Sequence, residues 1–134
     1  VHPPRIEPDA FLNRALTHGF GNGSLIRGYE AAGNLLQRER AGLTKLSRMD
    51  AASSPRRVSR ILLTTIDGSE RFYRHVEKLL LDDQPRVAGL VLDTRAETLS
   101  RLLTGEPGGI KCLLAADKHA VALILSALSR RLIP

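Results

Sequence analysis

The segment ILLTTIDGSERFYRHVEKLLLDDQPRVAGLVL, residues 61–92, determines the fold class that this sequence predicts. It opens with Ile61–Ile66, a continuous apolar and β-branched run typical of a strand buried on both faces. Asp-Gly-Ser at 67–69 is turn chemistry, and its serine can cap the helix that the apolar spacing predicts over 69–81. A second strand is expected over 87–92. Strand, helix and strand in this order predict two parallel strands joined by a right-handed crossover.

The same alternation continues towards the C-terminal end of the chain. Thr94 is placed to cap a helix over 95–104, and a third strand is expected over 110–115. Asp117 precedes a final amphipathic helix over 118–132. The connections are long enough for further parallel crossovers. We therefore predict an α/β fold, a three-layer α/β/α sandwich with a small, mostly parallel or mixed sheet.

Residues 1–59 show less periodicity than the strand–helix repeats of 60–134, and we expect a helical, basic, loop-rich lead-in there. A length of 134 residues fits one domain, so 1–134 is predicted to be a single α/β domain. The elements expected in the lead-in are an extended segment over 1–8, a helix over 10–18 capped by Asp9, a glycine-rich turn over 19–23, a helix over 25–40 capped by Ser24, and a basic loop over 41–59 with one helical turn near 43–49.

Positive charge is concentrated in the first half of the chain. The formal net charge is +6 at pH 7, with ten Lys or Arg against five Asp or Glu in residues 1–60 and ten against nine in residues 61–134. A one-sided basic field raises the local concentration of polyanions such as nucleic acids. The alternative interpretation is a solvated helix end followed by a soluble loop.

The sequence carries no recognisable catalytic or metal-binding motif. Its four histidines fall on different predicted elements without the spacing of metal ligands, so no metal is expected. There is no P-loop motif, and the glycine run over 19–23 follows a helix rather than a strand, which argues against a dinucleotide site. Ser69 has no base paired with it. We therefore predict a protein that is not an enzyme and that needs no cofactor.

The single cysteine, Cys112, lies in the apolar run 110–114 and has no partner for a disulfide within the chain. This favours a reducing compartment. The sequence has no apolar run of about 18 residues that could cross a membrane and no recognisable secretory leader. We expect a cytoplasmic protein that does not act at a membrane. The oligomeric state and the question of whether the chain is a fragment stay open.

Two segments resemble the kink-turn-binding ribosomal protein superfamily, especially its small bacterial YlxQ-type RNA-binding members. The first is GSLIRGYEAA, residues 23–32, continuing to Leu43, which is similar to the opening of that family. The second runs from Thr94 through Gly105 and the strand over 110–115. The match is partial, because the chain has Glu30, Ala31 and Asn34 where the kink-turn readers carry Asn-Glu after the second glycine and a Lys shortly beyond. The resemblance implies an α/β/α sandwich whose first helix and neighbouring loops contact RNA.

Taken with the charge distribution, the resemblance implies non-catalytic binding of ribosomal or other structured RNA. The arginines and the lysine would contact mainly phosphates, and the glycines would allow close approach of the backbone. The residues expected to bind RNA are Gly23, Arg27, Gly28, Glu30, Asn34, Arg38, Arg40, Lys45, Arg56 and Arg57.

Two other functions remain open. The stretch 61–69, a strand followed by Asp and a Gly-Ser turn, also resembles universal stress proteins, which implies a nucleotide or another small molecule as ligand. Such a ligand would lie at the carboxyl ends of the strands, beside Asp67, Asp93 and Asp117. The third possibility is a protein-interaction module that uses the basic loop as an exposed arm. The RNA target and its sequence specificity are also open.

Overall fold

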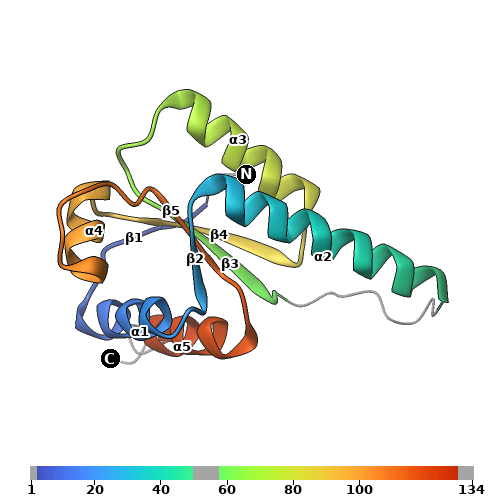
Figure 1. Cartoon of the computed structure of the whole chain (residues 1–134), viewed down its shortest axis with the longest axis horizontal. Helices are drawn as coiled ribbons and strands as arrows, with labels where there is room; N and C mark the ends of the chain where they lie inside the picture. The colour runs from blue at the N-terminus through green and yellow to red at the C-terminus, as the bar shows by residue number, and fades with distance from the viewer. Residues whose placement is uncertain (1–2, 50–57, 130–134) are drawn as a thin grey trace.

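The computed structural model describes residues 3–49 and 58–129, and within α2 it describes side chains only as far as residue 42. Over these residues the chain forms five helices around one five-stranded sheet (Figure 1). The elements are β1 (Arg5–Ile6), α1 (Ala10–Gly21), β2 (Leu25–Arg27), α2 (Tyr29–Met49), β3 (Arg60–Thr64), α3 (Glu70–Asp82), β4 (Val87–Leu92), α4 (Ala96–Thr104), β5 (Cys112–Ala115) and α5 (Lys118–Ser129).

The predicted three-layer α/β/α sandwich is confirmed. Ile61 and Leu63 of β3 pack into one core with α1, α4 and α5, whereas Leu62 packs into a second core with α2 and α3. Successive side chains of a strand point to opposite faces, so a strand covered on both sides needs an unbroken apolar run. This is why β3 lacks the alternation of a half-exposed strand, and β5 is buried in the same way.

The sheet is mixed, with the strand order β1-β4-β3-β5-β2. β1, β4 and β3 are parallel to one another, while β5 is antiparallel to both of its neighbours, β3 and β2. The expectation of a parallel crossover into the third predicted strand was therefore wrong. The direction of β5 also separates the three carboxylates that were predicted to lie beside a small-molecule ligand. Asp67 and Asp93 follow parallel strands and share an edge, but Asp117 follows β5 and lies at the opposite edge.

The predicted helix over 25–40 was wrong at its start. Leu25–Arg27 forms the edge strand β2, paired with β5, and helix α2 begins only after Gly28. Gly28 has φ = +100°, which lies outside the helical region, and its N–H donates to the Cys112 carbonyl at 3.0 Å. Because β5 offers ladder partners, pairing replaces the helix that local spacing suggested. Helix α2 then continues to Met49, into much of the predicted basic loop.

The other predicted elements of the first half also joined the sheet or lengthened. β1 lies within the expected extended segment 1–8 and pairs with β4. The predicted helix 10–18 extends to Gly21, and Asp9 caps it by accepting from the Leu12 N–H at 2.8 Å. Ser24 does not cap a helix; its carbonyl accepts from the Ala116 N–H at 2.9 Å. The first half is thus part of the scaffold and not only a lead-in.

A partly buried network of ion pairs ties α2 to the start of β3 and β4. Asp83, whose side chain is 1% exposed, accepts from Arg40 at 3.0 and 3.1 Å and from Arg86 at 3.2 Å. Glu39 accepts from Arg86 at 2.7 Å and from Arg60 at 2.8 Å. Hydrogen bonds from Arg60 and Arg86 outweigh the burial of Glu39, which alone would raise its pKa, and hold that pKa below its usual value. We call these five residues the Glu39–Asp83 network.

None of the helices in the described part of the chain is both long and apolar enough to cross a membrane.

Candidate nucleic-acid interface

All five strands reach one edge of the sheet. β1, β2, β3 and β4 end there, β5 begins there, and α2, α3 and α4 start from it (Figure 1). Backbone hydrogen bonds fix the loops to one another: the Thr65 N–H donates to the Lys111 carbonyl at 3.1 Å, and the Ile66 N–H donates to the Thr94 carbonyl at 3.1 Å. The edge is therefore built from segments that are far apart in the sequence.

Besides Arg5 of β1, which is paired with Asp93 at 2.7 Å, four exposed basic side chains lie along this edge, and we call these four the basic edge. They are Arg27 at the end of β2, Arg71 in the first turn of α3, Arg95 directly before α4, and Lys111 directly before β5. None of the four forms an ion pair with another described residue. Arg27 donates to the Gly109 carbonyl at 3.3 Å, which holds its guanidinium beside the loop that leads into β5. The positive charges are thus available to a polyanion.

Gly28 lies between Arg27 and the first turn of α2. A Cβ atom added there would meet no other atom within 4 Å, so the backbone borders open space. Its positive φ is a conformation that other residues rarely adopt. A helix N-terminus attracts anions through its N–H groups and its dipole. The start of α2 can therefore be approached closely by a phosphate held by Arg27.

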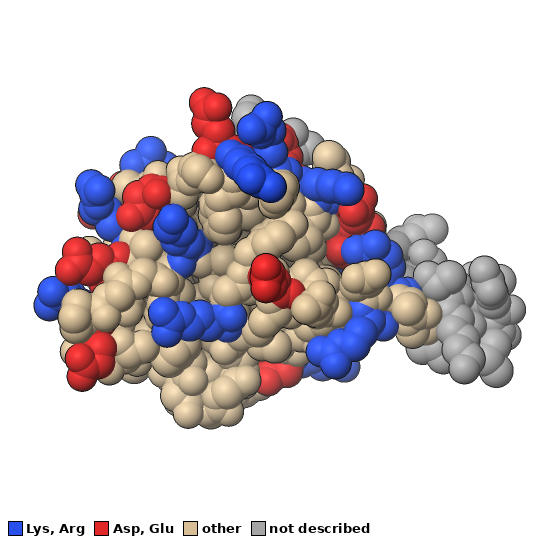
Figure 2. Space-filling view, turned by 45° about the horizontal axis from the view of Figure 1, so that its top comes forward, with Lys and Arg blue, Asp and Glu red and all other residues tan. Residues whose placement is uncertain are grey.

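Acidic side chains interrupt this positive surface. Glu30 and Glu70 are exposed in the first turns of α2 and α3, while Glu97 of α4 is paired with Arg101 at 3.1 Å. Figure 2 shows the same mixture on one face of the molecule, where Lys and Arg are spread among Asp and Glu. Binding to this edge would therefore depend on particular contacts as well as on net charge.

Asp67, at the centre of the edge, is occupied by the fold. Its carboxylate accepts from the Thr65 hydroxyl at 2.9 Å and from the Ala96 N–H at 3.0 and 3.2 Å. It therefore caps α4 from another element. The predicted cap, Thr94, was wrong, because Arg95 occupies the N-cap position and its side chain makes no capping bond. Partial burial alone would raise the Asp67 pKa, but the bonds from Thr65 and Ala96, with Arg95 nearby, lower it.

This geometry gives a stability prediction for Asp67→Ala. Loss of the cap should lower the free energy of unfolding at pH 7 by about 1–2 kcal/mol. A carboxyl whose folded pKa lies below its unfolded value stabilises the fold above the unfolded pKa, and this contribution is lost as the pH falls through the folded value. In urea denaturation, the difference in unfolding free energy between wild type and Asp67→Ala should thus be largest at pH 7 and should decrease below about pH 4. The same difference in unfolding free energy at pH 7 and below pH 4 would contradict the assignment of the Asp67 carboxylate as the cap of α4.

The structure does not bring the residues predicted to bind RNA together in one place. Arg27, Gly28 and Glu30 come together at the basic edge. Gly23 lies at the other end of β2, and Arg40 is held by Asp83 in the Glu39–Asp83 network.

Two more of the predicted residues, Asn34 and Arg38, are exposed farther along α2. Asn34 lines a polar groove of about 650 Å³ between α2 and α3, together with Gln37 and Lys78. The side chain of Lys45 and the whole of Arg56 and Arg57 lie outside the described residues.

Sequence reasoning missed Arg71, Arg95 and Lys111. They belong to the nearly neutral half of the chain, where a count of charges gives no signal. Their positions at the junctions between strands and helices could have indicated them, because these junctions meet at one edge once the sheet forms.

The thiol of Cys112 is buried in β5. Cys112 is 1% exposed, and burial raises its pKa to about 12, so it is not a nucleophile at neutral pH. Within 3–49 and 58–129, no three His, Cys, Asp or Glu side chains are grouped in a way that could hold a metal ion. Two histidines from different elements do meet: the rings of His18 and His119 are 5.7 Å apart between centroids.

Comparison with known proteins gives support for the fold alone. No protein-family model matches the chain, and no curated protein matches it either. A solved structure described as a protein with unknown function from Bacillus halodurans C is similar, with a TM-score of 0.62 and 10% sequence identity. The similarity covers 91% of this chain and 99% of that one, so the whole architecture is shared.

Proposed function

We propose that this protein is a non-catalytic RNA-binding protein that contacts structured RNA through the basic edge. The observation that carries the proposal is that four basic residues from separate segments of the chain lie exposed at one edge beside the open start of α2, namely Arg27, Arg71, Arg95 and Lys111. The partial resemblance to YlxQ-type RNA-binding proteins, which points to the start of α2 and neighbouring loops, supports the same region.

A polymer suits this surface better than a small ligand does. The four charges are exposed and distributed along an edge, as is usual for side chains that each contact a different phosphate. A nucleotide site would instead need polar groups that converge on one ligand. The small-molecule alternative relied on three carboxylates. Asp67 is already bound to Thr65 and Ala96, Asp93 is paired with Arg5 at 2.7 Å, and Asp117 lies at the opposite edge.

The test compares two double variants of equal net charge in filter binding with a structured ribosomal RNA fragment. Arg27→Gln with Lys111→Gln should weaken binding about tenfold or more and reduce the slope of log affinity against log salt by about 2, because two phosphate contacts are lost. Arg14→Gln with Lys118→Gln removes the same charge from exposed positions on α1 and α5. This control should stay within about threefold of wild type.

Two outcomes would reject the proposal. Equal losses in both double variants would mean that affinity follows net charge and not the basic edge. A wild-type affinity that does not change with salt would mean that phosphate contacts do not carry the binding.

A further inference from the structure

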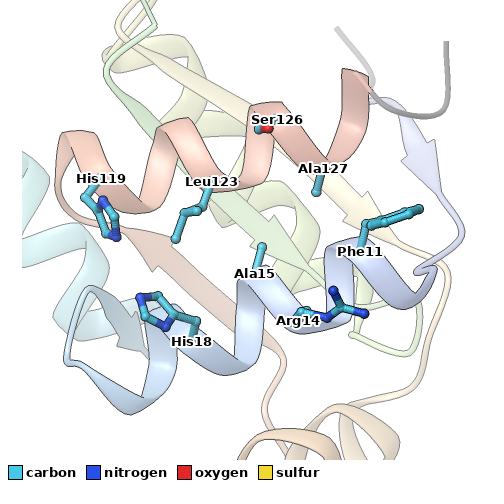
Figure 3. Close-up of a pocket in the computed structure, with 8 residues that line it drawn as sticks. All are labelled: Phe11, Arg14, Ala15, His18, His119, Leu123, Ser126 and Ala127. Carbon is cyan, nitrogen blue, oxygen red and sulfur yellow. The ribbon is translucent and has the colours of Figure 1, made fainter. Parts of the chain in front are cut away.

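A second candidate site lies in the helical layer formed by α1 and α5. The two helices leave a hollow of about 340 Å³ between them (Figure 3). The hollow is lined by Phe11, Arg14, Ala15, His18, His119, Leu123, Ser126 and Ala127. None of these residues belongs to the basic edge, so the hollow is separate from the proposed RNA interface.

The hollow exists because small side chains face each other where the helices pack. Ala15 of α1 and Ala127 of α5 lie opposite each other with Leu123 beside them, and they form an apolar floor. The rings of His18 and His119 meet at one end, 5.7 Å apart between centroids and inclined at 63°. Figure 3 shows Phe11 and Arg14 towards the other end.

The polar groups around this apolar floor are all neutral or basic. Arg14 carries a positive charge, the two histidines offer ring nitrogens, Ser126 offers a hydroxyl, and none of the described residues that line the hollow is a carboxylate. Asp117, the carboxylate nearest in sequence to the histidine pair, accepts from the Ala120 N–H at 2.9 Å and from the Ser24 hydroxyl, and it also interacts with His119. Arg14 forms no ion pair with another described residue.

We propose that the hollow between α1 and α5 binds a small apolar anion, a single aromatic or branched aliphatic group that carries one carboxylate. Ligand pockets usually measure about 300–1,000 Å³ and combine an apolar lining with a few orienting polar groups. At about 340 Å³ this hollow has room for one ring with its carboxylate. The apolar group would rest on Ala15 and Leu123, and the carboxylate would face Arg14 at the Phe11 end of the hollow, where positive charge is available.

Benzoate and its uncharged analogue benzamide are the probes that test this inference. Titration of the 15N-labelled protein should give saturable amide shifts confined to α1 and α5. Benzoate should bind about five- to tenfold more tightly than benzamide, because only benzoate gains a charge-assisted contact. Equal affinity for the two probes, shifts spread over other elements, or the absence of saturable shifts would each overturn the proposal.

Two variants test separately the contribution of the Arg14 charge and the contribution of the open volume of the hollow. Arg14→Gln should weaken benzoate binding about five- to tenfold and leave benzamide unchanged. Ser126→Leu should fill the hollow and abolish binding of both probes. Both side chains are exposed, so both variants should keep the wild-type amide spectrum away from the hollow. Arg38→Gln makes the same charge change on α2 and should bind both probes as wild type does. Unchanged benzoate affinity in Arg14→Gln would reject the anion site.

Discussion

Replacing Asp83 with alanine should lower the free energy of unfolding by about 3–5 kcal/mol. The Asp83 side chain is 1% exposed and forms ion pairs with both Arg40 and Arg86, and the Arg86 side chain is itself only 8% exposed. Removing the carboxylate would leave Arg86 with Glu39 as its single carboxylate partner in a region that water hardly reaches. A buried charge that loses a partner keeps its desolvation cost, so the loss greatly exceeds that of an exposed ion pair.

The neighbouring residue provides a matched control. Asp82 carries the same side chain at the end of α3 but is exposed. Asp82→Ala should change stability by less than about 0.5 kcal/mol. In thermal unfolding, Asp83→Ala should melt about 10–20 °C lower than Asp82→Ala, given about 3–5 °C per kcal/mol for a domain of this size. Equal melting temperatures for the two variants would show that the Glu39–Asp83 network contributes little.

The second large effect is expected in β3, where two adjacent leucines test the two cores separately. Leu62 is 0% exposed and packs with α2 and α3, whereas Leu63 is 1% exposed and packs with α1, α4 and α5. Leu62→Ala and Leu63→Ala should each cost about 2–5 kcal/mol in urea denaturation, because each leaves a cavity in a closed core. If one side of β3 faced solvent, only one of the two substitutions would lower the free energy of unfolding by this amount.

Leu125→Ala is the control for this pair. Leu125 is an α5 leucine with 47% of its surface exposed, and its truncation should cost less than about 1 kcal/mol. If Leu62→Ala cost no more than Leu125→Ala, the layer formed by α2 and α3 would not cover the sheet in solution. That result would also affect the proposed function, since α2 and α3 position Arg71 and the open start at Gly28.

Together these predictions separate stability from binding. The Glu39–Asp83 network holds the far end of the α2 layer, where β3 and β4 begin, and the basic edge lies where these strands end. Variants of the network should therefore reduce the fraction of folded protein without changing the salt slope of RNA binding. Variants of the basic edge should change the salt slope and leave the melting temperature close to that of wild type, because their side chains are exposed.

The sequence alone determined the β3–α3–β4 unit. The strand Val87–Leu92 was predicted with its observed bounds, and the cap at Ser69 was correct, with its hydroxyl accepting from the Phe72 N–H at 3.1 Å. Both signals are local: an apolar run between turn residues and a hydroxyl before a helical stripe. Such features need no information from distant parts of the chain. The three-layer architecture followed from the apolar run, which requires cover on both faces.

Only the tertiary structure decided which segments pair and which side chains meet. Leu25–Arg27 is a strand because β5 lies beside it, although its own residues also fit a helical stripe. The direction of β5 placed Asp117 at the opposite edge from Asp67, and Asp67 replaced Thr94 as the cap of α4. Tertiary packing of distant segments likewise creates the basic edge and brings His18 against His119. Long-range pairing carries no local signature, because a strand edge accepts any backbone, and packing of the whole sheet selects the partner and its direction.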